Sequence, residues 1–221
     1  MLAAPATVYP FNDESGDWIS LFDGKSLDGW KANEHVNTFK VVDGQIVAHG
    51  GRSHLFHVGL VQNADFKNFE PSADVMTRPG ANSGIYFHTA YQPSGWPAAG
   101  FEVQVANTDE GRNGYSERKK TGSLYAVRNV YKQLQRQRVV PDEHPGSRQA
   151  DADRVSNMLV VDYVEPDPPL RADLNFQRVI NRGTFALQGH DPRSTTYFKN
   201  IRVRPLAGRW LGACILLESK G

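Results

Sequence analysis

The chain has 221 residues, a length that fits one large all-β domain and is sufficient to bury a hydrophobic core. Its formal net charge of +1 gives no reason to expect nucleic acid or an anionic membrane as a partner, and no stretch approaches the roughly 18 apolar residues of a membrane helix. Cys214 is the only cysteine, so an intrachain disulfide is excluded while the redox compartment stays open.

The N-terminal segment MLAAPATVYP has neither the basic region nor the apolar run of a signal peptide. Its small residues could remain after cleavage of such a peptide, behind an added Met, but a cytoplasmic start fits equally well. We expect a periplasmic or extracellular protein whose signal peptide is absent or removed. We also expect an extension over residues 1–17, a sandwich domain over residues 18–206 and a tail over residues 207–221.

Short runs of alternating apolar and polar residues, separated by Gly and Pro, dominate the sequence and predict strands rather than helices. Residues 39–42 and 45–48 flank Asp43-Gly44, which predicts a β-hairpin because this dipeptide tolerates the positive φ angles of a type I′ turn. Further strands are expected at residues 18–22, 73–77, 83–89, 101–107, 123–127, 159–163, 184–190 and 197–204. We therefore predict an all-β, antiparallel two-sheet sandwich.

Three of these strands, at residues 83–89, 101–105 and 184–190, each have one apolar face and one face rich in hydrogen-bonding groups. Side chains on a strand point to opposite sides with period two. If the three strands share a sheet, their polar faces bring together Tyr86, His88, Glu102, Gln104, Gln188 and His190. This set suits a carbohydrate, although one face of an antiparallel sheet is often only solvated.

Other residues are weaker candidates for a site. Trp96 lies in the loop 92–100 and either stacks on a sugar ring or packs on the sheet. Lys120 either reaches the substrate or belongs to a solvated basic turn. His54 and His57 lie three apart, a spacing that suits metal ligands on a helix only, so no metal site is predicted there. Asp191 could bind calcium through oxygen, but otherwise no cofactor is expected.

The chain resembles the 3-keto-disaccharide hydrolase family, which has the concanavalin A-like jelly-roll fold. The resemblance is carried by segments in the family's order, covering most of residues 21–206: LFDGKSLDGW, NADF, RPGANSGIYFHTAYQPSGWPAAGFEVQV, TGSLYAV, VVDYVEP and GTFALQGHDPRSTTYFKNIRVRPL. It implies an enzyme that cleaves the glycosidic bond of a 3-keto-glycoside. Relatives often have arginine where His88 stands, which counts against His88 as a base.

A ketone at C3 of a sugar acidifies the proton on C2, so cleavage by elimination or hydrolysis needs a base, an oxyanion stabiliser and an acid. We expect His88 or His190 to be the base, and Glu102 either to orient it or to act as the acid. Substrate hydroxyls and the ring are expected to meet Asn82, Tyr86, Trp96, Gln104, Lys120 and Gln188. The alternatives are a non-catalytic, lectin-like sugar-binding module and an inactive relative.

Residues 135–157 depart from the pattern on either side of them. The segment QRQRVVPDEHPGSRQADADRVSN has no aromatic residue and no usable alternation. One permitted set of codons for RQRVVPDEHP encodes DNEWFRMNI when its reading frame is shifted by one nucleotide. Family relatives carry an EWF motif at this place. We expect an irregular segment produced by a frame shift, with an ordinary polar insertion loop as the alternative.

Overall fold

The computed structural model describes residues 17–108, 116–133, 158–166, 168–169, 177–206 and 212–217. The expectation of an irregular segment at residues 135–157 lies outside the described residues, as does the N-terminal extension up to residue 16.

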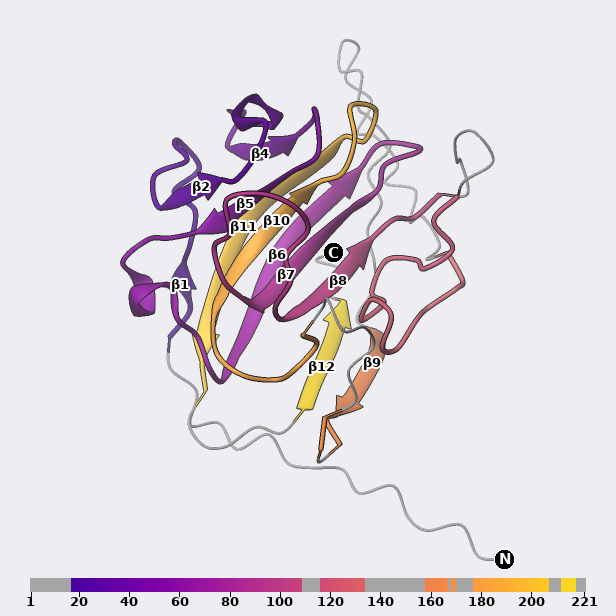
Figure 1. Cartoon of the computed structure of the whole chain (residues 1–221). Coiled ribbons are helices and arrows are strands. Elements are labelled where there is room, and N and C mark those ends of the chain that lie inside the picture. Colours follow the sequence, from indigo (N-terminus) through magenta and orange to yellow (C-terminus); the bar gives the residue numbers. More distant parts are fainter. Residues whose placement is uncertain are drawn as a thin grey trace, which may run out of the picture.

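Ten strands form two five-stranded sheets in the described part of the chain, and every pairing is antiparallel. The first is here called the back sheet, and its central strand is β11 (Thr196–Pro205). On one side β11 pairs with β6 (Phe69–Thr77), and on the other it pairs with β1 (Ile19–Ser20) and β4 (Gln45–Ala48). β4 in turn pairs with β3 (Phe39–Val42). The second, the site sheet, has the order β2 (Trp30–Ala32), β5 (Ser53–His57), β10 (Thr184–Gly189), β7 (Ser83–Thr89) and β8 (Phe101–Val105). Figure 1 shows the two sheets layered on each other, which confirms the predicted sandwich.

The core lies between the two sheets and contains the apolar residues of each alternating strand. Leu55, Leu187, Ile85 and Val103 follow one another across the site sheet in register and pack in this core. The back sheet contributes Ile46, Phe198 and Val203 among others, all three fully buried. Since neighbouring residues on a strand point to opposite sides, the polar residues between them must leave the core.

The predicted hairpin at residues 39–48 forms as expected. Its strands are β3 and β4, and both turn residues have positive φ, 48° at Asp43 and 72° at Gly44. These are the angles that a type I′ turn requires.

The segment at residues 123–127 is not the strand that the sequence predicted. It forms backbone hydrogen bonds to β8, from Gln104 N–H to Ser123 O and from Tyr125 N–H to Glu102 O, both 2.9 Å. The chain then reverses at Ala126, whose φ is +61°, and the Leu124 and Val127 backbones bond to each other across that turn. The extended backbone therefore ends after residues 123–125, at a single left-handed residue that the apolar periodicity of the sequence does not reveal.

A third pair of strands lies outside both sheets. β9 (Met158–Val164) corresponds to the strand expected at residues 159–163, and β12 (Gly212–Leu217) falls within the stretch expected as a tail. Figure 1 shows the β9–β12 pair below β8 in that view. The helices of the described residues are two 3-10 turns, η1 (Val36–Thr38) and η2 (Val61–Ala64), so none could cross a membrane.

Among the glycines that the structure describes, Gly100 would bring a Cβ closest to its neighbours, and Gly95 provides a matched control. Both have φ of +79°, but a Cβ at Gly100 would overlap the Phe87 carbonyl oxygen and lie 2.6 Å from the His88 carbonyl carbon. A Cβ at Gly95 would meet only Gln92 Nε2, at 3.7 Å. We predict that Gly100→Ala destabilises the fold by about 3 kcal/mol or more and Gly95→Ala by only about 1 kcal/mol.

Denaturant unfolding of the two variants and the wild type measures this difference. Equal losses of stability in both variants would show that the left-handed backbone, and not the contact with β7, limits Gly100.

Candidate functional site

The face of the site sheet that points away from the back sheet, here called the site face, carries a cluster of polar side chains. Tyr86 lies opposite Glu102 across the β7–β8 pair, and Gln188 lies opposite His54 across the β10–β5 pair. Each of the four is next to a core residue in its strand, so its side chain points to the face opposite to the core. All four are also buried, and Trp96 of the loop between β7 and β8 lies against His54 on this face.

The carboxyl group of Glu102 is the centre of a hydrogen-bonded triad. Tyr86 Oη donates to Glu102 Oε2 at 2.8 Å, and Gln188 Nε2 donates to Glu102 Oε1 at 2.9 Å. Gln188 Nε2 also lies 3.3 Å from Tyr86 Oη. The side chain rests on Gly84 of the adjacent strand, where a Cβ would lie 2.9 Å from the carboxyl carbon, so the carboxyl group occupies this place because that residue is glycine.

Burial changes the acidity of both oxygen groups in this triad. It raises the pKa of Glu102 to about 7, although the hydrogen bonds from Tyr86 and Gln188 and the nearby Arg178 favour the carboxylate. Burial, together with the neighbouring Glu102 carboxylate, raises the pKa of Tyr86 well above 10, so its hydroxyl stays a donor. Glu102, only 4% exposed, can therefore exchange a proton near neutral pH.

His54 belongs to the same cluster, and sequence reasoning missed it as a site residue. Its ring lies edge-on to Tyr86, with centroids 5.4 Å apart, and burial lowers its pKa to about 3, which makes it a neutral imidazole. Neither ring nitrogen has a hydrogen-bond partner among the described residues, and nor has Gln188 Oε1. Buried polar atoms without partners are unfavourable, so a hydroxylated ligand would be stabilised there.

Trp96 packs on this cluster, which agrees with one of the two positions expected for it, packing on the sheet. Its ring centroid is 5.3 Å from that of His54 and 5.4 Å from that of His190, and the Arg52 guanidinium lies 5.5 Å from it. The loop is held in place at Gly95, whose N–H donates to Glu34 Oε2 at 3.0 Å. Glu102 is only 4% exposed, so a sugar ring can reach it only if side chains around the cluster move.

His190 lies at the edge of the cluster, paired with Asp191. His190 Nδ1 is 2.9 Å from Asp191 Oδ2. Burial alone would raise the pKa of Asp191, but the hydrogen bonds from His190, Arg193 N–H and Ser194 lower it. Both oxygens of Asp191 accept hydrogen bonds from donors, an arrangement that orients His190 and differs from the oxygen cage of a calcium ion. The described residues contain no group of three or more His, Cys, Asp or Glu placed to hold a metal ion.

The expectation that His88 shares the face of Glu102 is wrong. The pairing of β7 with β10 shifts register here, and His88 has a φ of +52°, so its side chain leaves the alternation of the strand. Its ring packs against Phe69 of the back sheet, with centroids 5.1 Å apart, and its Nε2 lies 2.9 Å from the Lys67 carbonyl oxygen. A bulge of this kind is not visible in the period-two pattern that predicted the site.

Three of the expected substrate-binding residues make contacts within the protein. Gln104 Nε2 donates to Asn82 Oδ1 at 2.6 Å and to Ser83 O at 3.2 Å, so these two side chains are paired beside the cluster. Lys120 Nζ donates to the carbonyl oxygens of Thr108 and Glu117, which fixes a buried turn. These contacts indicate a supporting role for Gln104 and Lys120.

His54 and His57 point to opposite faces of the site sheet, because three residues on a strand span one and a half periods. The sequence did contain a signal for His54: it alternates with Leu55, whose apolar side chain marks the core face. Because the segment SHLFH is buried along its whole length, its polar face did not stand out in the sequence.

Replacing Glu102 with glutamine should remove one pH-dependent part of the stability. In the unfolded chain this carboxyl ionises near its ordinary pKa of 4.5, whereas the folded protein keeps the proton up to about 7. Between these values the folded state binds more protons, so its free energy of unfolding falls as the pH rises and is level above about 7. A pKa change of that size corresponds to ~3 kcal/mol.

Denaturant unfolding of wild type and Glu102→Gln at several pH values between 4.5 and 8 tests this. The difference between the two proteins isolates Glu102 from His54 and His57, whose lowered pKa values make stability rise with pH in both. Parallel stability curves would mean that Glu102 titrates as an exposed glutamate does.

Comparison with known proteins places the chain in a family. The family model of the 3-keto-alpha-glucoside-1,2-lyase-like domain matches residues 17–204. Two solved structures from Parabacteroides distasonis, both candidate glycosyl hydrolases, share the fold. The first is 21% identical with a TM-score of 0.56, and the match covers 87% of this chain and 94% of that chain. The second is 19% identical with a TM-score of 0.52, and the match covers 86% of this chain and 100% of that chain. A comparison with curated proteins gave no match. Because the family model covers most of the sequence, this chain belongs to the 3-keto-alpha-glucoside-1,2-lyase-like domain family.

Proposed function

We propose that this protein cleaves the glycosidic bond of 3-keto-glycosides at the site face, with Glu102 as the group that exchanges a proton with the substrate. The observation that supports this most is a buried carboxyl whose pKa is raised to about 7 and which lies beside polar atoms without partners. A group of this pKa can both take and return a proton under physiological conditions. The membership of the family supports the class of substrate.

The chemistry begins at C2 of the oxidised sugar. The C3 ketone acidifies the C2 proton; a base removes it, and the electrons of the C–H bond form the C2–C3 enolate. The enolate then expels the C1 substituent, so the C1–O bond breaks and the departing oxygen takes a proton. Such an elimination needs one base and one acid, and not the paired carboxylates of an ordinary glycosidase.

Glu102 is suited to be the base. Tyr86 Oη and Gln188 Nε2 both donate to its oxygens, and these contacts describe the ionised carboxyl. A carboxylate in a buried site with a raised pKa is also a stronger base than an exposed one. This assignment reverses the one expected from the sequence, in which a histidine was the base.

His190 then supplies the proton to the departing oxygen. Asp191 holds its Nδ1, so its Nε2 is the nitrogen that can face the substrate. His88 is not the base in this proposal, because it lies on the other side of the sheet.

The remaining groups of the cluster position the ring and stabilise the enolate. A neutral imidazole has one donor and one acceptor nitrogen, so His54 can donate to the developing C3 oxyanion and accept from a hydroxyl. Gln188 Oε1 is a second acceptor. Trp96 provides an aromatic face for the sugar once its loop has moved, and the return of this loop over the bound sugar would exclude water during the reaction.

The direct experiment compares a 3-keto-disaccharide with the parent disaccharide that has a hydroxyl at C3. We predict release of sugar from the 3-keto substrate and none from the parent, because only the ketone acidifies C2. Glu102→Gln should cut turnover at least about a hundredfold, the size of one acid–base group. Its circular dichroism spectrum should match the wild type, since glutamine has nearly the same shape.

Two results would contradict the proposal. If the 3-keto substrate binds and no sugar is released, the protein is a sugar-binding module. If Glu102→Gln retains full turnover, the chemistry does not pass through Glu102.

A further inference from the structure

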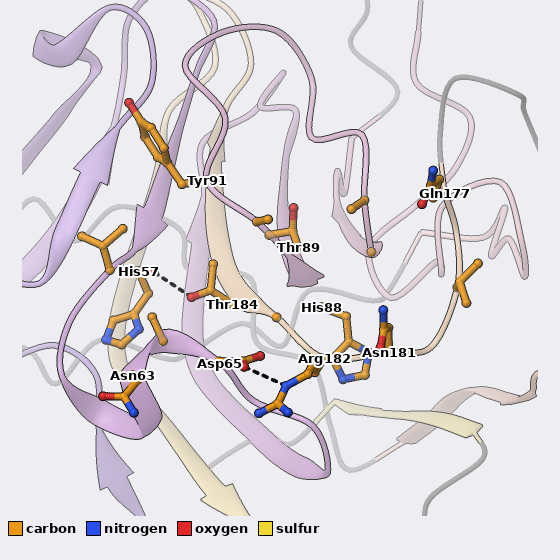
Figure 2. A pocket seen from close by; sticks show the side chains of 17 residues that line it. His57, Asn63, Asp65, His88, Thr89, Tyr91, Gln177, Asn181, Arg182 and Thr184 are labelled. Carbon is orange, nitrogen blue, oxygen red and sulfur yellow. Dashed lines mark hydrogen bonds and ion pairs between the residues drawn. The ribbon is translucent and has the colours of Figure 1, made fainter.

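A pocket of about 600 Å³ opens at the end of the site sheet, away from the Glu102 cluster. It lies where β5 ends, where β7 ends and where β10 begins, and Figure 2 shows the side chains around it. None of its lining residues belongs to the triad or contacts Trp96 or His190. Its volume is within the range of small-molecule sites.

The His88 bulge forms one wall of this pocket. Gly100 and Gly183 pack against the backbone of the bulge from two sides, and a Cβ at either position would overlap it. Arg178 Nη1 fixes Gly100 by donating to its carbonyl oxygen at 2.9 Å. Because the bulge is packed on both sides in this way, it is a built feature of the sheet, and His88 is one of the residues that line the pocket.

The inner wall contains polar atoms whose hydrogen bonds are not made. His57 Nδ1, His88 Nδ1 and Thr89 Oγ1 are buried and have no partner among the described residues. Each of these residues is at least nine-tenths buried. Leaving three such atoms unpaired is costly, and a polar group that enters between these side chains would relieve that cost.

The hydrogen-bonding state of the two histidines defines what the wall can accept. His88 Nε2 faces the Lys67 carbonyl oxygen, so it must carry the hydrogen, and burial lowers the pKa of His88 and keeps the ring neutral. Its Nδ1 is therefore an acceptor and requires a donor from a ligand. Burial lowers the pKa of His57 to about 4, so this ring is also neutral.

The outer part of the pocket is polar without net charge. Asp65 and Arg182 form an ion pair of 2.7 Å at the rim and so neutralise each other. Amide side chains of Asn63, Gln177 and Asn181 line the walls, whereas the ring of Tyr91 points away from the pocket in Figure 2 and packs against Phe56 and Lys31. Amides and hydroxyls are groups that bind a neutral sugar, whereas an anion would meet Asp65, and a metal ion would find one carboxylate, which Arg182 already pairs.

We propose that this pocket is a second binding site, for a neutral polyhydroxylated ligand of monosaccharide size. Its hydroxyl groups would donate to His88 Nδ1 and exchange hydrogen bonds with Thr89 Oγ1 and the amide side chains. The site requires no chemistry at Glu102, so it stands whether or not the protein cleaves 3-keto-glycosides.

The test is a titration of the whole, isotope-labelled protein with D-glucose, followed by NMR at the imidazole nitrogens of its seven histidines. We expect the His57 and His88 signals to move together and to saturate. Thr89→Val, which removes the hydroxyl and keeps the shape of the side chain, should weaken this binding about fivefold, as loss of one hydrogen bond does. Glu102→Gln should leave it unchanged, which separates this site from the site face.

Three outcomes would overturn the proposal. The first is that the His57 and His88 signals do not respond to glucose while those of His54 and His190 do. The second is that Thr89→Val binds glucose as the wild type does. The third is that inorganic phosphate or zinc, and not glucose, moves the two signals, because the pocket would then be an anion or metal site.

Discussion

The carboxyl group of Glu102 is the constraint on which the site depends. A buried carboxyl is unfavourable unless hydrogen bonds and space are provided for it. Here Tyr86 and Gln188 provide the donors, from the strands on one side of β8, and Gly84 provides the space. The result is a carboxyl group whose pKa is raised to about 7, in a place that water does not reach easily.

The two faces of the site sheet divide the tasks of stability and chemistry. One face is packed against the back sheet by residues such as Leu55 and Leu187, and this packing keeps the strand register exact. The register in turn sets Gln188 opposite His54 and Tyr86 opposite Glu102. A slip of one residue would turn each of these polar side chains into the core, so the core determines the site.

The bulge at His88 interrupts this division at one end of the sheet. Its left-handed backbone transfers a side chain from the site face to the core side. The same bulge, held between Gly100 and Gly183, forms a wall of the second pocket. The sheet thus carries two polar regions that differ in origin, one from regular alternation and one from a break in it.

Regular alternation is also what the sequence could predict. The hairpin around Asp43-Gly44 and the shared face of Tyr86, Glu102 and Gln188 follow from it, because both depend on local patterns. His88 did not follow, since a single positive φ reverses the side chain without a change in the apolar pattern.

Burial explains the other misses. Lys120 lies in a turn whose carbonyl oxygens occupy its ammonium, which only tertiary structure reveals. His54 lies in a strand that is buried on both sides, so its alternation with Leu55, which marks the side that faces Trp96, does not stand out in the sequence. The raised pKa of Glu102 likewise depends on neighbours from other strands.

The most direct test of this account is a titration of the Glu102 carboxyl carbon by NMR, with Glu102→Gln used to assign its signal. The account predicts a midpoint near pH 7, because burial outweighs the hydrogen bonds that favour the carboxylate. A midpoint near 4.5, the ordinary value for a glutamate, would contradict it, since Glu102 would then be a solvated carboxylate and the site face would have no proton-exchanging group of the kind proposed.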